Sequence, residues 1–250
     1  PDPRDQRLRP SVLVRWTEPG NDSTRSPRAH AVLIDTGPDF RQQALRAGLS
    51  HLDAVFYTHG HADHILGMDD LRPLSFVSHH ADGPIPLYAT SETASVLERI
   101  YDYTFAPRAT YTNRARVELR PLVDRILIHG VEFIKVPVLH GKMHVAGFRF
   151  GDTAYLTDVS EIPESSFPLL EGVQTLVLPA LRHKPHPTHA TVQQAIAWAK
   201  RIGARQTWLT HIAHELGHEE TNRILPQNVR MAWDGLQLPV RLHVNREERA

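Results

Sequence analysis

The stretch Thr58-His59-Gly60-His61-Ala62-Asp63-His64 decides how we interpret this chain. It follows the apolar run Ala54–Tyr57 and places three imidazoles and a carboxylate within six residues. The small residues between them let the backbone turn tightly, so that alternate side chains can converge. A helix would not bring them together, because His59 and His61 would project from different sides of it. We therefore predict metal ligands on a loop at the end of a strand.

Metal-ligating residue types follow apolar runs at five places in the chain. Each of them alone is more simply a polar residue at a strand exit. Together they predict a shared site, because ligands at the ends of adjacent strands meet at one edge of a sheet. The five residues are Asp35, His59, His140, Asp158 and His211.

Apolar alternation and helical spacing predict an α/β fold made of one large domain or two fused halves. Strands are expected at 11–16, 31–34, 53–57, 86–89, 133–139, 145–150, 153–156, 175–178 and 206–209, and helices at 39–47, 91–101, 163–170, 191–202 and 215–225. The runs 229–233 and 236–240 look like a hairpin turned at Asp234-Gly235. We expect a turn at 18–28. The aromatic stretch 102–116 is a packed surface loop, a lid or a homodimer contact.

Composition excludes several classes of protein. Lysine plus arginine and aspartate plus glutamate both number 28, so no overall field attracts nucleic acid or a membrane surface. No apolar run approaches the roughly twenty residues of a membrane span. The absence of cysteine excludes disulfides and thiolate ligands. No signal peptide is visible, so we expect a cytoplasmic protein that acts on a small molecule.

The candidate ligands form two sets with nitrogen and oxygen donors. Such sets suit zinc and tolerate manganese. Two ions about 3.5 to 4 Å apart would hold a hydroxide for attack at phosphorus or at an activated carbonyl. The first set is His59, His61 and His140, and the second is Asp63, His64 and His211, with Asp158 free to bridge both.

Several motifs together resemble the metallo-β-lactamase superfamily. They are THGHADH, the single His140, Asp158 after Leu-Thr, and His211 within LTHIAH. More narrowly, GMDDLR, THATV and WDGLQL resemble the phosphoribosyl 1,2-cyclic phosphate phosphodiesterases, the PhnP-like enzymes. The resemblance covers essentially the whole chain. It implies one hydrolase domain over 1–250, folded as a four-layer αββα sandwich with its site at one edge of the two sheets.

The beginning of the chain departs from that subfamily. Its members usually start with a strand carrying a TGTS-like turn, followed by a cysteine-rich loop. That loop binds a structural zinc together with a histidine three residues beyond the last catalytic one. This chain has that histidine, His214, but neither the strand nor the cysteines. Because the sequence also lacks an initiator methionine, we favour a missing N-terminal strand over a branch that has lost the structural zinc.

The expected activity is hydrolysis of small phosphodiesters, cyclic ones preferred, by a metal-bound hydroxide, with Asp63 and Asp158 in the catalytic centre. His189, just before a predicted helix, is the candidate general acid for the leaving alkoxide; the alternative is a solvent-facing neighbour of the helix cap. Other activities stay open. They are a glyoxalase-type thioesterase or lactonase, a relative of the tRNA-processing ribonuclease, although no basic arm is seen, and a non-catalytic binding protein.

The remaining residues of interest receive simpler interpretations. We expect Asp35 to orient a ligand histidine. Arg72 either holds a phosphate or pairs with Asp69 or Asp70. Surface positions are the simpler expectation for every histidine that is not a candidate ligand, catalytic residue or structural-zinc residue. His183 and His186 belong to this group, but they follow a buried strand and could also contact a phosphate. The group comprises His30, His51, His79, His80, His129, His144, His183, His186, His218 and His243.

Overall fold

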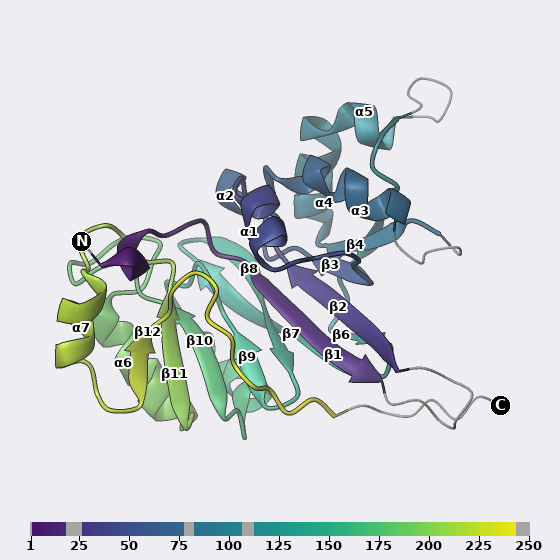
Figure 1. Ribbon diagram of the computed structural model, residues 1–250. Coiled ribbons are helices and arrows are strands. Elements are labelled where there is room, and N and C mark those ends of the chain that lie inside the picture. Colours follow the sequence, from purple (N-terminus) through teal and green to yellow (C-terminus); the bar gives the residue numbers. More distant parts are fainter. Residues whose placement is uncertain (1, 19–26, 78–82, 107–112, 244–250) are drawn as a thin grey trace. The chain divides into compact units, whose positions relative to one another are not determined.

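The computed structural model describes residues 2–18, 27–77, 83–106 and 113–243. The chain divides into two compact units, which Figure 1 labels by their helices and strands. The first unit is Arg9–Leu122, and the second unit combines Pro1–Leu8 with Val123–Ala250. Each unit holds one sheet of its own. None of the described helices is long and apolar enough to cross a membrane.

The first unit is built on a five-stranded sheet of order β1-β2-β3-β4-β5. Strand β1 is antiparallel to β2, and every later pair is parallel. Its elements are β1 (Val12–Glu18), β2 (Arg28–Ile34), α1 (Phe40–Arg46), β3 (Ala54–Phe56), α2 (Ala62–Ile65), the 3₁₀ turn Met68–Asp70, α3 (Leu71–Val77), β4 (Ile85–Ala89), α4 (Ser91–Ile100), α5 (Asp102–Phe105) and β5 (Val117–Pro121).

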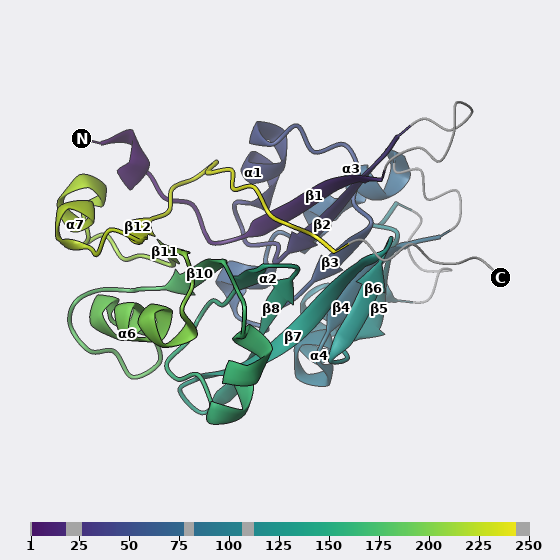
Figure 2. The same cartoon turned by 90° about the horizontal axis from the view of Figure 1, so that it is seen from below.

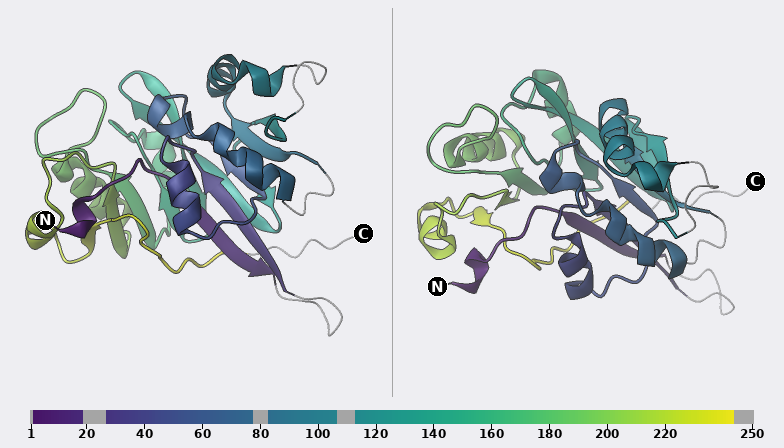
Figure 3. Two further views of the ribbon diagram at one scale, coloured as in Figure 1. Left: turned by 45° about the horizontal axis from the view of Figure 1, so that its top comes forward. Right: turned by 90° about the horizontal axis from the view of Figure 1, so that it is seen from above.

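The central part of this sheet is rich in apolar residues, as expected for parallel strands that are largely buried. All three residues of β3 are buried, and so are the last five of β2. Phe40 of α1 and Leu97 of α4 join the core formed by these strands and by β4. Figure 3 gives two further views of this sheet and its helices. The buried strands fix where their carboxyl ends, and the residues that follow them, must lie.

The second unit is built on a seven-stranded sheet of order β12-β11-β10-β9-β8-β7-β6. Strands β9 to β12 are mutually parallel, and β8 is antiparallel to both β9 and β7. Strand β7 therefore runs in the same direction as β9, β10 and β11, so the carboxyl ends of all four lie at one edge. The strands are β6 (Arg125–Ile128), β7 (Val131–His140), β8 (Met143–Phe150), β9 (Thr153–Tyr155), β10 (Thr175–Pro179), β11 (Gln206–Thr210) and β12 (Val229–Met231).

Two α-helices and two 3₁₀ segments complete the second unit. Figure 2 shows α6 and α7 beside strands β10 to β12. Helix α6 starts with a reciprocal capping box between Thr191 and Gln194 and ends at Gly203, whose φ of 75° is readily adopted by glycine. These elements are the 3₁₀ segments Pro3–Asp5 and Glu164–Leu170, and the helices α6 (Val192–Ile202) and α7 (His218–Ile224).

The α/β class expected from the sequence is confirmed, with two sheets and helices in each unit. The predicted hairpin at 229–240 is wrong. Strand β12 covers only Val229–Met231 and pairs in parallel with β11, and residues 236–240 form no strand. The Asp234-Gly235 turn is present, but the carboxylate of Asp234 accepts a hydrogen bond from the backbone of Leu8 at 3.0 Å. The chain after this turn does not come back beside β12.

Other differences have local causes. Strands β5 and β6 were not predicted, because they are short and half-exposed. His30 and His218 were expected at the surface, but each is only 1% exposed. The ring of His30 stacks on Trp16, and the ring of His218 meets Trp233 edge-on, so aromatic packing replaces solvent at both. The stretch 102–116 was expected to be irregular, but residues 102–105 form helix α5, and residues 107–112 lie outside the described residues. Residues 19–26 of the expected turn, and His79 and His80, also lie outside them.

Candidate active site

Two neighbouring strands of the first unit bring Asp35 next to the loop Thr58–His64, called the histidine loop below. Asp35 follows β2, Thr58 follows β3, and these strands are paired in parallel. The backbone N–H of Asp35 donates to the carbonyl of Phe56 at 2.9 Å, which extends the ladder by one residue. The carboxylate of Asp35 therefore meets the start of the motif at Thr58, which lies 23 positions later in the chain.

The buried carboxylate of Asp35 anchors the histidine loop through three hydrogen bonds. Its Oδ1 accepts from the backbone N–H of Thr58 at 2.8 Å. Its Oδ2 accepts from the Thr58 hydroxyl at 2.8 Å and lies 2.7 Å from Nδ1 of His64. The Thr58 hydroxyl also lies 3.0 Å from Nδ1 of His59. The expectation that Asp35 orients a candidate ligand thus agrees with its contact to His64.

The histidines of the motif are neighbours within the first unit. The ring centroid of His59 lies 4.5 Å from that of His61 and 4.3 Å from that of His64. Nε2 of His64 lies 3.7 Å from a carboxylate oxygen of Asp63. Helix α2 begins just after His61, so one short turn presents Asp63 and His64. All four motif residues therefore share one region of this unit.

Asp158 is the centre of the cluster in the second unit. It lies three residues beyond β9, while His140 ends β7 and His211 follows β11. One carboxylate oxygen, Oδ1, lies 2.9 Å from Nε2 of His211, and the other, Oδ2, lies 3.8 Å from Nε2 of His140. The Thr157 hydroxyl donates to Oδ1 at 3.1 Å. The two oxygens of one buried carboxylate thus face two different imidazoles.

His189 belongs to the same cluster. Its ring centroid lies 4.6 Å from that of His140 and 4.9 Å from that of His211, on which it stacks. Among the described residues no partner reaches its buried Nδ1. Burial lowers the pKa of His189 to about 4; the carboxylate of Asp158 opposes this shift, and the neighbouring imidazoles reinforce it. His189 is half-buried and its ring lies beside those of His140 and His211.

The backbone is strained at three of these strand exits. Asp35, Asp158 and His211 have φ values of 64°, 52° and 51°, in the left-handed region that side chains other than glycine rarely adopt. Such conformations cost about 1–3 kcal/mol each and cluster at functional sites. Among the described non-glycine residues, the one other example is His129. The strain therefore coincides with the residues that the motif analysis selected.

The donors in both units suit a divalent metal ion. Nδ1 of His64 lies against Asp35, and Nδ1 of His140 lies 2.7 Å from the carbonyl oxygen of Thr188. These acceptors fix the proton on Nδ1 and leave Nε2 as the coordinating atom, the usual arrangement around metal-binding histidines. In the second unit, ligand atoms of Asp158, His189 and His211 all lie within 4.8 Å of one another. The residues present fit a site of imidazole and carboxylate ligands.

Sequence analysis missed the threonines that support these side chains. Thr58 and Thr157 immediately precede His59 and Asp158, and their hydroxyls bind carboxylates of the two clusters. The threonine directly before each of these two candidate ligands was the sequence signal that could have identified them. Among the described residues Arg72 forms no ion pair with Asp69 or Asp70; its Nη1 lies 3.4 Å from the carbonyl oxygen of Asn113, and the phosphate role stays a prediction.

The other histidines are mostly as expected. His183 and His214 are exposed. His186 is half-buried, and its ring centroid lies 5.0 Å from that of His189. It therefore lies beside the cluster of the second unit, which the simple surface expectation did not anticipate.

A family profile described as "Beta-lactamase superfamily domain" matches residues 30–212. The chain belongs to the β-lactamase superfamily. The matched region includes every candidate ligand and His189, and the superfamily predicted from the motifs is thereby confirmed.

Individual proteins add detail to this membership. A Porphyromonas gingivalis protein named octanoyltransferase is 32% identical over 240 residues, which cover 94% of this chain but only 46% of that protein. The chain thus spans less than half the length of this curated relative. A Mycobacterium bovis protein named ribonuclease Z is 28% identical, over 87% of this chain and 84% of the relative.

A solved structure described as a new diphosphatase from the PhnP family is also similar. It is 47% identical, has a TM-score of 0.85, and covers 98% of this chain and 89% of that one. The metallo-β-lactamase fold is therefore confirmed, and the resemblance to PhnP-like proteins with it. The fold of this superfamily implies divalent metal ions.

Replacing Asp35 by asparagine should destabilise the histidine loop. Asparagine has one acceptor oxygen where Asp35 uses two, so its NH₂ group must face either the backbone N–H of Thr58 or the Thr58 hydroxyl and Nδ1–H of His64, and a buried donor loses its acceptor. Hydrogen bonds to charged groups contribute about 1.5–3 kcal/mol, and we expect the free energy of unfolding to fall by about 2 kcal/mol in urea titrations.

Asp39→Asn is the matched control, because its carboxylate accepts from the backbone of Arg9 at an exposed position. We expect it to change the free energy of unfolding by less than about 1 kcal/mol. Equal losses in the two variants would contradict the anchoring role of Asp35.

Proposed function

We propose that the protein binds two divalent ions, zinc or manganese, and uses them to hydrolyse small phosphate compounds. Nitrogen and oxygen ligands of this kind suit either metal. One set comprises His59, His61 and His140, the other comprises Asp63, His64 and His211, and Asp158 bridges both.

The observation that carries this proposal is the position of Asp158. Its Oδ2 faces His140 of the first proposed set, and its Oδ1 faces His211 of the second. A carboxylate whose two oxygens face imidazoles of the two proposed sets supports a bridging role. The strained backbone at Asp158 supports the same proposal, because strain is retained where the side chain must point in one direction.

The bound ions would supply a hydroxide nucleophile at neutral pH and neutralise charge on the phosphoryl oxygens. The chain's own residues would do the rest. Asp35 and the Thr188 carbonyl hold His64 and His140 in the tautomer with a free Nε2. Thr58 and Thr157 fix the orientation of the carboxylates that they contact. His189 would protonate the leaving oxygen, and a bound phosphoryl anion would raise the pKa of its ring as Asp158 does.

For the substrate we propose a small molecule with a phosphodiester or diphosphate linkage. The motifs that resemble PhnP-like enzymes support a cyclic phosphodiester. The similar structure described as a diphosphatase supports a diphosphate. Both linkages present a phosphorus atom with an oxygen leaving group, which two-ion centres handle by in-line displacement. The net charge of zero is compatible with a small substrate.

A second candidate is processing of RNA, which the similarity to proteins named ribonuclease Z favours. The chemistry would be the same, because an RNA strand is a phosphodiester. The difference lies in how a long polyanion would be held, which requires many basic contacts. Acyl thioesters and lactones remain carbonyl substrates for the same nucleophile.

One assay separates these candidates. Zinc-loaded protein would be given a ribose cyclic phosphate, a nucleoside diphosphate, an aryl phosphodiester, a precursor tRNA, an acyl thioester and a lactone side by side. We expect turnover of the small phosphate compounds with kcat/KM at least about tenfold above the carbonyl substrates and the tRNA. The control is the same protein after chelation of its metal, which should lose activity. Faster turnover of thioester or lactone would overturn the proposal, and faster turnover of tRNA would favour the second candidate.

His189→Ala tests the proton donor. A general acid matters most when the leaving group is poor, so this variant should hydrolyse an alkyl or ribose diester roughly a hundredfold more slowly. Hydrolysis of a nitrophenyl diester, which needs little protonation, should fall much less. Metal content should stay unchanged.

His183→Ala is the matched control, an exposed histidine of the same loop. It should leave both rates near the wild-type values. Equal losses on both substrates in His189→Ala would indicate a role in binding, and no loss on either would remove His189 from the mechanism.

A further inference from the structure

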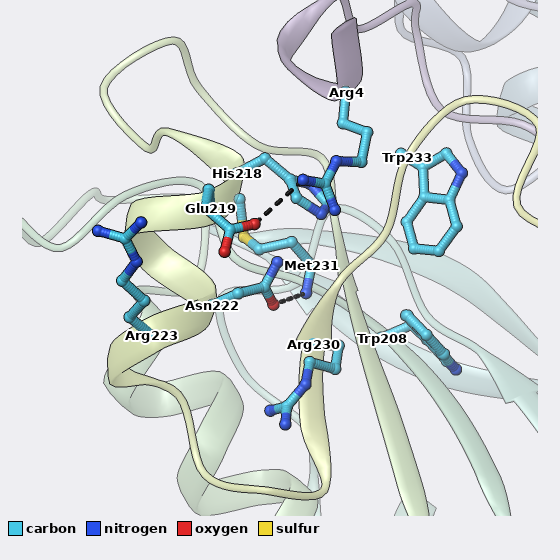
Figure 4. A pocket seen from close by; sticks show the side chains of 9 residues that line it. All are labelled: Arg4, Trp208, His218, Glu219, Asn222, Arg223, Arg230, Met231 and Trp233. Carbon is cyan, nitrogen blue, oxygen red and sulfur yellow. Dashed lines mark hydrogen bonds and ion pairs between the residues drawn. The ribbon is translucent and has the colours of Figure 1, made fainter. Parts of the chain in front are cut away.

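The second unit contains a pocket that includes none of the proposed metal ligands. Figure 4 shows it between helix α7, strands β11 and β12, and the N-terminal 3₁₀ turn. Its volume is about 440 Å³, within the usual range of small-molecule sites. Trp208 of β11 and Asn222 of α7 are among the residues that line it. This cavity needs an explanation that hydrolysis at the metal centre does not give.

Arginine dominates the charge of the pocket. Arg4, Arg223 and Arg230 all line it, against one carboxylate, Glu219. Arg4 pairs with that carboxylate at 3.0 Å and with Asp2 at 2.8 Å, so the surplus of positive charge comes from Arg223 and Arg230. Arg230 uses Nη1 to donate to the carbonyls of Pro226 and Val229, which leaves its other nitrogens as donors. The surplus of guanidinium groups favours an anion with several oxygens, such as a phosphate.

Two indole rings provide an aromatic surface in the same pocket. The ring centroids of Trp208 and Trp233 lie 5.8 Å apart at an angle of 76°. Trp233 is 36% exposed, so part of its ring is accessible to a ligand. A planar ring of the ligand can stack on such an indole, as bases do in proteins that bind single-stranded nucleic acid.

A buried polar atom gives a second, independent indication of a ligand. His218 lines the pocket and is only 1% exposed, yet no described residue forms a hydrogen bond with its Nδ1. Burial lowers the pKa of His218, and the charge of Arg4 adds to this, so the ring is neutral and can donate or accept one hydrogen bond. The amide oxygen of Asn222 accepts from the backbone of Met231 at 2.9 Å, which leaves its NH₂ group as a donor.

We propose that this pocket binds a nucleotide, with its phosphate held by Arg223 and Arg230 and its base stacked on Trp233. Arginine donors, indole faces and single hydrogen-bonding groups are the features that recognise phosphate, base and sugar in turn. The ligand is either a free nucleotide or one nucleotide of an RNA strand. The proposal does not depend on the substrate of the metal centre.

The test is calorimetric titration of the metal-loaded protein with AMP. We expect a Kd below about 1 mM for wild-type protein. Arg223→Ala and Trp233→Leu should each weaken binding about tenfold, because one removes a charge-assisted contact and the other removes the stacking surface. Both variants should hydrolyse an aryl phosphodiester at the wild-type rate.

Arg205→Ala is the matched control, since Arg205 is an exposed arginine of the same unit that does not line the pocket. It should bind AMP as wild type does. Two further probes identify the ligand. Ribose 5-phosphate should bind at least about fivefold more weakly than AMP, because it lacks the base. A short oligoadenylate that binds more tightly than AMP would identify RNA as the source, and one that binds equally or less tightly would identify the free nucleotide.

Three results would overturn the proposal. Wild-type protein with no AMP binding at millimolar concentration is one. Equal affinity for ribose 5-phosphate and AMP, which would exclude base recognition, is another. The third is AMP binding that is unchanged in both Arg223→Ala and Trp233→Leu, which would place the nucleotide elsewhere. The melting temperatures of both variants should lie near that of the wild type. A loss of AMP binding is then due to the altered pocket and not to unfolding.

Discussion

Strand exits in a left-handed backbone conformation are the constraint on which the proposed chemistry of this protein depends. At Asp35, Asp158 and His211 the chain leaves a parallel strand with positive φ, although none of these residues is glycine. A residue that simply continued the strand would place its side chain above or below the sheet. The strained turn instead directs the side chain along the sheet edge at the carboxyl ends of the strands. The polar residue that follows the neighbouring strand lies at the same edge. The buried strands before each turn supply the packing energy that tolerates this strain.

Hydrogen bonds then set the ring orientation and the protonated nitrogen of the candidate ligand histidines. Asp35 joins Thr58 and His64, and the Thr188 carbonyl holds His140, so two candidate ligands have their ring orientation and proton position set before any metal binds. Such supporting contacts typically change metal affinity by ten- to a hundredfold when removed. The polar core of each unit is therefore organised for ligand geometry at a cost in stability.

Much of this was predictable from the sequence because the buried strands are apolar runs and the ligand types follow them directly. The α/β class came from that pattern and is confirmed. The seven proposed ligands came from the same pattern and from the THGHADH motif, and they stay predictions. Features set by contacts between distant segments were not predictable. The 229–240 hairpin failed because Asp234 contacts Leu8, more than two hundred residues away. His30 and His218 were taken for surface residues because nothing local indicates that Trp16 and Trp233 cover them.

The central claim is that Asp158 bridges two metal ions. The metal content of the wild-type protein and of an Asp158 variant is therefore the most direct measurement. Purified wild-type protein and Asp158→Ala would be resupplied with zinc, freed of excess, and analysed by mass spectrometry of the metal, with the exposed Asp124→Ala as control. The account predicts about two ions per chain in wild type and control, and loss at both sites in Asp158→Ala. A wild-type content that never exceeds about one ion per chain, or an Asp158→Ala protein that retains the wild-type content, would contradict it.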